Sequence, residues 1–82
     1  MTEPMAAREV KRSLSIAGHR TSVSLEAPFW ETLKEIAAQE GQSVAALVAM
    51  IDQGRAPGGL SLSGAIRVYV LNRLRARLSL GR

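Results

Sequence analysis

The sequence predicts a mostly α-helical fold that starts with a short β-strand or hairpin, continues with three helices and is completed as a homodimer. Three observations lead to this prediction. Apolar and polar residues alternate between residues 11 and 25, whereas apolar residues recur every three or four positions from 26 to 78. Gly and Pro residues interrupt the helical pattern at two places. A chain of 82 residues buries only a modest core, and a lone strand leaves its edges unpaired, so a second copy is the simplest completion.

Composition excludes several classes of protein. The chain has no cysteine and a single histidine, His19, so disulfides and thiolate or histidine metal clusters are excluded, and we expect no metal and no cofactor. The chain contains no run of about 18 apolar residues, so we expect no membrane span. The polar N-terminus lacks the apolar region of a secretory signal. We therefore expect a cytoplasmic protein.

The charge is unevenly distributed along the chain. The formal net charge of +4 divides into +2 over residues 1–25, −4 over 26–52 and +6 over 53–82. Basic segments of this kind suit a polyanion such as DNA. Solubility alone is the other explanation for a charge of this size.

The alternating segment allows two arrangements. Residues 1–10 are expected to form a flexible arm. The first half of the alternation either continues this arm into a single strand, or pairs with the second half through a two-residue turn at Gly18 and His19. The hairpin register pairs Ile16 with Thr21 and Leu14 with Val23, and it places all four serines of the segment on one face.

Local signals delimit three helices. The first begins at Glu26-Ala27-Pro28, because Pro is tolerated in a first helical turn, and it ends near Glu40, before Gly41. Ser43 is the expected N-cap of the second helix, which ends at Gly54. Ser61 or Ser63 caps the third. We thus expect an arm over 1–10, a strand-helix-helix unit over 11–54, a linker over 55–61 and a C-terminal helix over 62–78 packed on the same domain.

The segment 20–52 resembles the Arc/MetJ-type ribbon-helix-helix family of bacterial DNA-binding proteins. The resemblance rests on the strand Arg20-Thr21-Ser22-Val23-Ser24-Leu25, the spacing of Phe29, Leu33 and Ile36, and the turn Gly41-Gln42-Ser43-Val44. The third helix looks like the C-terminal helix of a smaller bacterial branch of that family. The resemblance implies a homodimer whose β-ribbon enters the major groove of DNA, and hence a small transcriptional regulator.

The resemblance also implies roles for individual residues. The strand positions that touch base edges fall on Arg20, Ser22 and Ser24, and an arginine can contact guanine in a bidentate way. Phosphate contacts fall on Ser43 and Val44 at the start of the second helix, and we add the basic residues Lys11 and Arg12. The expected dimer core is Val23, Leu25, Phe29, Trp30, Leu33, Leu47 and Ile51.

A second hypothesis concerns the C-terminal helix. An antitoxin-like or adaptor module would bind a protein partner through residues 62–78, whereas the first hypothesis requires double-stranded DNA and a homodimer or larger homo-oligomer. An enzyme is not expected, because the sequence contains no Ser/His/Asp set with plausible geometry, no Gly-rich phosphate loop and no cluster of metal ligands.

Overall fold

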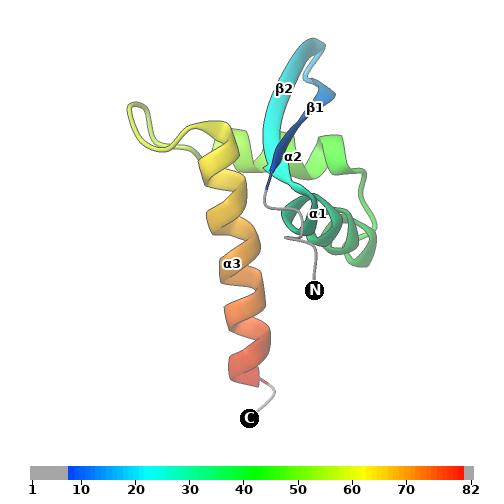
Figure 1. Cartoon of the computed structure of the whole chain (residues 1–82), viewed down its shortest axis with the longest axis vertical. Coiled ribbons are helices and arrows are strands. Elements are labelled where there is room, and N and C mark those ends of the chain that lie inside the picture. Colours follow the sequence, from blue (N-terminus) through cyan, green and yellow to red (C-terminus); the bar gives the residue numbers. More distant parts are fainter. Residues whose placement is uncertain (1–7, 81–82) are drawn as a thin grey trace.

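The chain folds as an antiparallel β-hairpin whose apolar face is covered by three helices (Figure 1). The computed structural model describes residues 8–80. Its elements are β1 (Glu9–Ile16), β2 (His19–Glu26), α1 (Ala27–Gln39), α2 (Val44–Gln53) and α3 (Leu62–Leu80). The predicted class, mostly helical with an N-terminal hairpin, is confirmed.

The hairpin turn differs from the sequence prediction by one residue. Its central residues are Ala17 and Gly18, with φ angles of 51° and 83°, rather than Gly18 and His19. Positive φ at both central residues defines a type I′ turn, whose twist matches that of the flanking strands. Ile16 therefore pairs with His19, and Leu14 with Thr21. Each partner moves by two residues, so every side chain stays on its predicted face.

The strands are also longer than expected. Glu9 and Val10 fall in the range predicted to be an arm, but they pair with Glu26 and Leu25 and complete eight cross-strand pairs. The prediction that the arm extends to residue 10 is therefore wrong for its last residues. The rest of that prediction, over residues 1–7, lies outside the described residues.

The helix ends follow the local signals. Gly41 has a φ of 68° and donates its N–H to Ala38, and the next N–H bonds to Ala37, which ends α1 as a Schellman motif. The Oγ of Ser43 accepts the N–H of Ala46 at 3.0 Å and caps α2. Of the two serines proposed for α3, Ser61 is the cap, since its Oγ accepts the N–H of Gly64 at 3.0 Å.

One hydrophobic core lies between the hairpin and the helices. α2 contacts β1, whereas α1 and α3 contact β2. The buried side chains are Ile16, Val23, Leu25, Leu33, Ile36, Ala37, Leu47, Val48, Ile51, Ile66 and Val70. Ile66 and Val70 belong to α3, so the third helix is part of the core rather than an appendage. Beyond them, α3 continues past the other elements (Figure 1).

Five residues of the expected dimer core are already buried within a single chain: Val23, Leu25, Leu33, Leu47 and Ile51. Their side chains leave almost no surface for a second copy. Phe29 and Trp30 remain partly exposed at the start of α1. None of the helices in the described part of the chain has the length and apolar character needed to span a membrane.

Candidate nucleic-acid interface

The outer face of the hairpin is polar and open. Ser13 is directly opposite Ser22, Ser15 is opposite Arg20, and Lys11 is opposite Ser24. Because side chains alternate along a strand, these three cross-strand pairs share the face that the helices do not cover. All six residues are exposed apart from Ser24, which is partly buried. The face thus offers hydroxyl groups flanked by two long basic side chains.

The two acids of this face, Glu9 and Glu26, lie at one end of it and are partly offset by a single arginine of α3. At the open end of the hairpin, Glu9 and Glu26 both bind the guanidinium of Arg67, with N–O distances of 2.7 and 3.0 Å. Within residues 8–80, Lys11 and Arg20 take part in none of the ion pairs. Two uncompensated cations therefore lie beside the serine hydroxyls, where an anion can approach.

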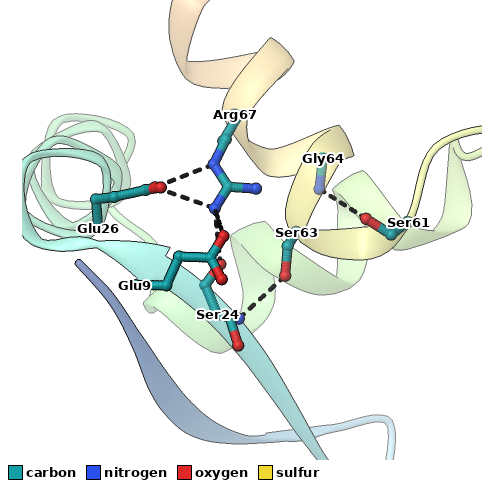
Figure 2. Close-up of polar contacts among 7 residues, drawn as sticks. All are labelled: Glu9, Ser24, Glu26, Ser61, Ser63, Gly64 and Arg67. Atoms are coloured by element: carbon teal, nitrogen blue, oxygen red, sulfur yellow. Dashed lines mark hydrogen bonds and ion pairs between the residues drawn. The ribbon is translucent and has the colours of Figure 1, made fainter. Parts of the chain in front are cut away.

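Ser24 is held by α3 rather than free on the open face. Its backbone N–H donates to the Oγ of Ser63 at 3.0 Å, and its carbonyl accepts a hydrogen bond from Arg67 at 3.1 Å (Figure 2). Of the three predicted base contacts, Arg20 and Ser22 are exposed and Ser24 is the least accessible. The first turns of α3 fix the end of β2 through these bonds.

Glu26, one of the two carboxylates bound to Arg67, has a perturbed pKa. The pKa of Glu26 lies below its ordinary value, first because its carboxylate accepts a backbone N–H and then because of the hydrogen bond and positive charge of Arg67, against an opposing effect of desolvation. A lowered pKa means that the ionised form is the one that the fold stabilises. Glu26 is therefore a structural anion, and Figure 2 shows its side chain directed at Arg67.

Lys11 and Arg12 were predicted together as phosphate contacts, but the structure places them on opposite faces. Lys11 shares the open face with Arg20. The guanidinium of Arg12 lies 5.2 Å from the ring centroid of Trp30, beneath the hairpin. Its Nε is buried and has no hydrogen-bond partner among the described residues. Cation–π stacking compensates only part of that burial.

Ser43 and Val44 start a different element. The Oγ of Ser43 is occupied by its capping bond to Ala46, and its carbonyl accepts the N–H of Leu47. No acidic residue lies in the first turn of α2, so the positive end of the helix dipole is not offset there. This end can accept a phosphate, but the structure does not bring it into hydrogen-bond contact with the hairpin.

Sequence reasoning did not assign three residues of this region. Ser13 and Ser15 belong to the open face, where their alternation with Leu14 and Ile16 had placed them, but they were given no role in the site. Arg67 is separated by 41 residues from Glu26 and by 58 from Glu9, so no local pattern indicated it.

Comparison with known families supports this architecture. A family model described as a ribbon-helix-helix domain matches residues 9–74, from the start of β1 into α3. Comparison with curated proteins and comparison with solved structures gave no match. The family match covers most of the 82-residue chain and includes the hairpin, both following helices and much of the third. On this basis, the chain belongs to the ribbon-helix-helix domain family.

Proposed function

We propose that the protein is a sequence-specific DNA-binding homodimer, a small bacterial transcriptional regulator that acts in the cytoplasm. Ribbon-helix-helix domains are generally DNA-binding modules of regulators. The observation that carries the proposal is the open hairpin face, where Lys11 and Arg20 have no acidic partner among residues 8–80 and flank exposed serines. This face is the part of the molecule best suited to the major groove.

The residues of that face divide into two roles. Arg20 supplies a bidentate donor for guanine, and the hydroxyl of Ser22 donates to or accepts from a base edge. Lys11 contacts phosphate, together with the N-terminus of α2 at Ser43 and Val44. Arg12 has no part in this proposal, because its guanidinium lies over Trp30 on the helix-covered face.

The test begins with selection of duplexes from a random pool, followed by fluorescence anisotropy on the enriched sequence at several salt concentrations. Arg20→Ala is expected to cost about 1–3 kcal/mol and to relax specificity at one base pair. Lys11→Ala is expected to weaken all duplexes alike and to reduce the salt slope by about one for each phosphate that Lys11 neutralises.

Arg75→Ala is the matched control, because Arg75 is exposed on α3, away from the hairpin, and the substitution removes the same charge. Its affinity for DNA should stay close to that of the unmodified protein. If no duplex is enriched over random DNA, or if Arg75→Ala weakens binding as much as Arg20→Ala does, the hairpin face is not the DNA-binding surface.

A second candidate function is supported by an apolar groove beside α3. The groove has a volume of about 540 Å³, and its lining includes Met50, Leu60 and Val68, which are 43–53% exposed. A protein partner bound there would use the outer side of α3. A free C-terminal tail of the antitoxin kind is disfavoured, because Ile66 and Val70 are core residues. Val68→Asp, with the fold checked by circular dichroism, should abolish partner recovery if this function is correct.

A further inference from the structure

The apolar groove beside α3 is built by three neighbouring segments of the chain. Met50 belongs to α2, Leu60 to the loop between α2 and α3 (Figure 1), and Val68 and Tyr69 to α3. Among residues 8–80, those of the hairpin contribute nothing to its lining. The side chains of Met50, Leu60 and Val68 are 43–53% exposed, although each is large and apolar. Exposed apolar residues that gather in one groove mark a surface for another molecule.

Arg55 fixes the shape of the groove. Its Nε and Nη2 donate to the Oδ1 of Asp52 at 3.0 and 2.8 Å, and its Nη1 donates to the carbonyl of Leu60 at 3.1 Å. One guanidinium therefore ties the loop to the last turn of α2. On the other side of the groove, Ala65 of α3 packs against the hydrophobic core. A site that is formed before binding loses little conformational entropy when a partner enters it.

The outer side of α3 continues the apolar surface beyond the groove. Residues 68, 71, 75 and 78 recur at intervals of three and four, so they follow one side of the helix. This side is turned away from Ile66 and Val70, the buried residues of α3. Val68, Leu71 and Leu78 are 43%, 51% and 73% exposed. Ten residues of helix rise about 15 Å, so this side accommodates an occupant of about three helical turns.

The charge along this side is positive. α3 carries four arginines and no acidic residue. Arg67 and Arg73 bind acids of the hairpin and of α1, whereas Arg75 takes part in none of the ion pairs within residues 8–80. Arg75 is exposed and lies between Leu71 and Leu78 on the outer side. The occupant that complements this side therefore carries acidic groups next to its apolar ones.

A second copy of this chain does not offer such a surface. Pairing of α3 with α3 would bring arginines together without an acid to offset them. α1 has the exposed acids Glu31 and Glu35, but the exposed large apolar residues of the described chain all lie on other segments. Asp52, the acid of α2, is already bound to Arg55. Within residues 8–80, no helix presents apolar anchors together with a free acid.

We propose that the groove and the outer side of α3 bind an amphipathic helix of a different protein, whose apolar side chains recur every three or four residues and are flanked by acidic ones. Such a helix matches the spacing of Val68, Leu71 and Leu78. Its apolar side chains enter between α2 and α3, and its acids meet Arg75. The inference rests on the second candidate function and names its partner class. It leaves the open face of the hairpin free for DNA.

Selection of helical peptides tests the proposal without a known partner. A phage-displayed library that randomises one face of a scaffolded helix is selected against the full chain and counter-selected against Val68→Asp. Because Val68 is 43% exposed, aspartate is compatible with the fold, which circular dichroism checks. The enriched clones should carry apolar residues three or four positions apart with Asp or Glu beside them. A library without enriched clones, or clones with Lys or Arg at the flanking positions, would contradict the proposal.

Reversal of the charge at residue 75 tests the electrostatic part. The strongest peptide and a copy with lysine in place of each acid are titrated by fluorescence anisotropy. The acidic peptide should bind the unmodified protein about two- to fivefold more tightly for each acid that meets Arg75, and Arg75→Glu should reverse the preference. Leu71→Asp should weaken both peptides at least about tenfold. Arg20→Ala removes the same charge from the hairpin and is the matched control, so it should change neither affinity. An unchanged preference in Arg75→Glu would overturn the assigned role of Arg75.

Two other occupants give different results. If a second copy covers the groove, Val68→Asp and Leu71→Asp should lower the molar mass measured by analytical ultracentrifugation. If a membrane covers it, the unmodified protein but neither variant should sediment with vesicles of anionic phospholipid. Either result would overturn the proposed helix partner.

DNA binding is measured separately on the same variants. A protein that prefers one duplex but enriches no peptide would contradict this inference and leave the DNA-binding function standing. A protein that enriches acidic peptides but prefers no duplex would contradict the DNA-binding function and leave this inference standing.

Discussion

Arg67 joins three segments that are far apart in the sequence. Its guanidinium binds Glu9 and Glu26 and lies 5.8 Å from the ring centroid of Phe29. It also donates to the carbonyl of Ser24. A planar guanidinium with several donors can satisfy all of these groups at once, which a lysine ammonium cannot do with the same geometry. One side chain therefore fixes the hairpin against α1 and α3.

Replacement of Arg67 should destabilise the fold. Arg67→Met keeps the apolar stem but removes the charged hydrogen bonds, and we expect the free energy of unfolding to fall by about 1–3 kcal/mol. Urea denaturation followed by circular dichroism measures the change. Arg75→Met, the exposed control on the same helix, should stay within about 0.5 kcal/mol of the unmodified protein. Equal decreases in the free energy of unfolding of the two variants would show that the polar contacts of Arg67 contribute nothing to stability.

The contribution of Glu26 to the stability of the fold depends on pH. Its pKa is lower in the folded chain than in the unfolded one, so its contribution to stability is full above the ordinary glutamate pKa and is lost as the pH falls through the folded value. Glu26→Gln should therefore have a lower Tm than the unmodified protein at pH 7. The difference in Tm should shrink as the pH is lowered below about 4.3. A difference that is constant from pH 7 to pH 3 would contradict this role.

At the scale of elements, the sequence predicted the helices well because their limits are local. Gly41, Ser43 and Ser61 act on backbone groups within a few residues of themselves, so their roles can be read from the chain. The strand faces were also predictable, since period two survives a slip of two residues. The exact register was not, because both Ala17-Gly18 and Gly18-His19 place a glycine in the turn.

The long-range contacts of the candidate site could not be predicted in the same way. The hydrogen bond between Ser24 and Ser63 joins residues 39 apart, and it fixes the end of β2 against α3. The burial of Arg12 against Trp30 depends on how the hairpin sits on α1. Sequence alone placed Lys11 and Arg12 together because they are adjacent, although adjacent strand residues point to opposite faces.

The hairpin turn holds Ala17 in a strained backbone conformation that a substitution can relieve. Ala17 adopts a φ of 51°, a conformation that costs a residue with a Cβ roughly 1–2 kcal/mol, whereas asparagine followed by glycine is a preferred type I′ pair. Ala17→Asn should raise the free energy of unfolding by about 0.5–1 kcal/mol, measured by urea denaturation. Ala17→Val is the opposing variant, and it should lower stability because a β-branched side chain fits this conformation worst. Stabilisation by valine would contradict the turn assignment.

At the scale of the whole molecule, acidic and basic segments of the sequence pair with each other. Arg67 and Arg73 of α3 bind Glu26 and Glu40, respectively, at the two ends of α1. The acidic middle of the chain is thus partly neutralised by the basic C-terminal helix. Lys11 and Arg20, on the open face of the hairpin, take part in none of the ion pairs within residues 8–80, so these two cations remain available to a polyanion. The net charge of +4 alone gave no indication of this division.

The hairpin and α3 should also unfold together, because they share one core. Ile66 is fully buried and Val70 is 2% exposed, whereas Leu78, on the same helix, is 73% exposed. Ile66→Ala should cost about 2–5 kcal/mol, a large share of the roughly 5–15 kcal/mol that stabilises a typical domain. Leu78→Ala should change stability by less than about 0.5 kcal/mol. The discriminating measurement is amide hydrogen exchange: destabilisation by Ile66→Ala should accelerate exchange in β2 and α1 as much as in α3, whereas loss of protection confined to α3 would show that the third helix folds as a separate unit.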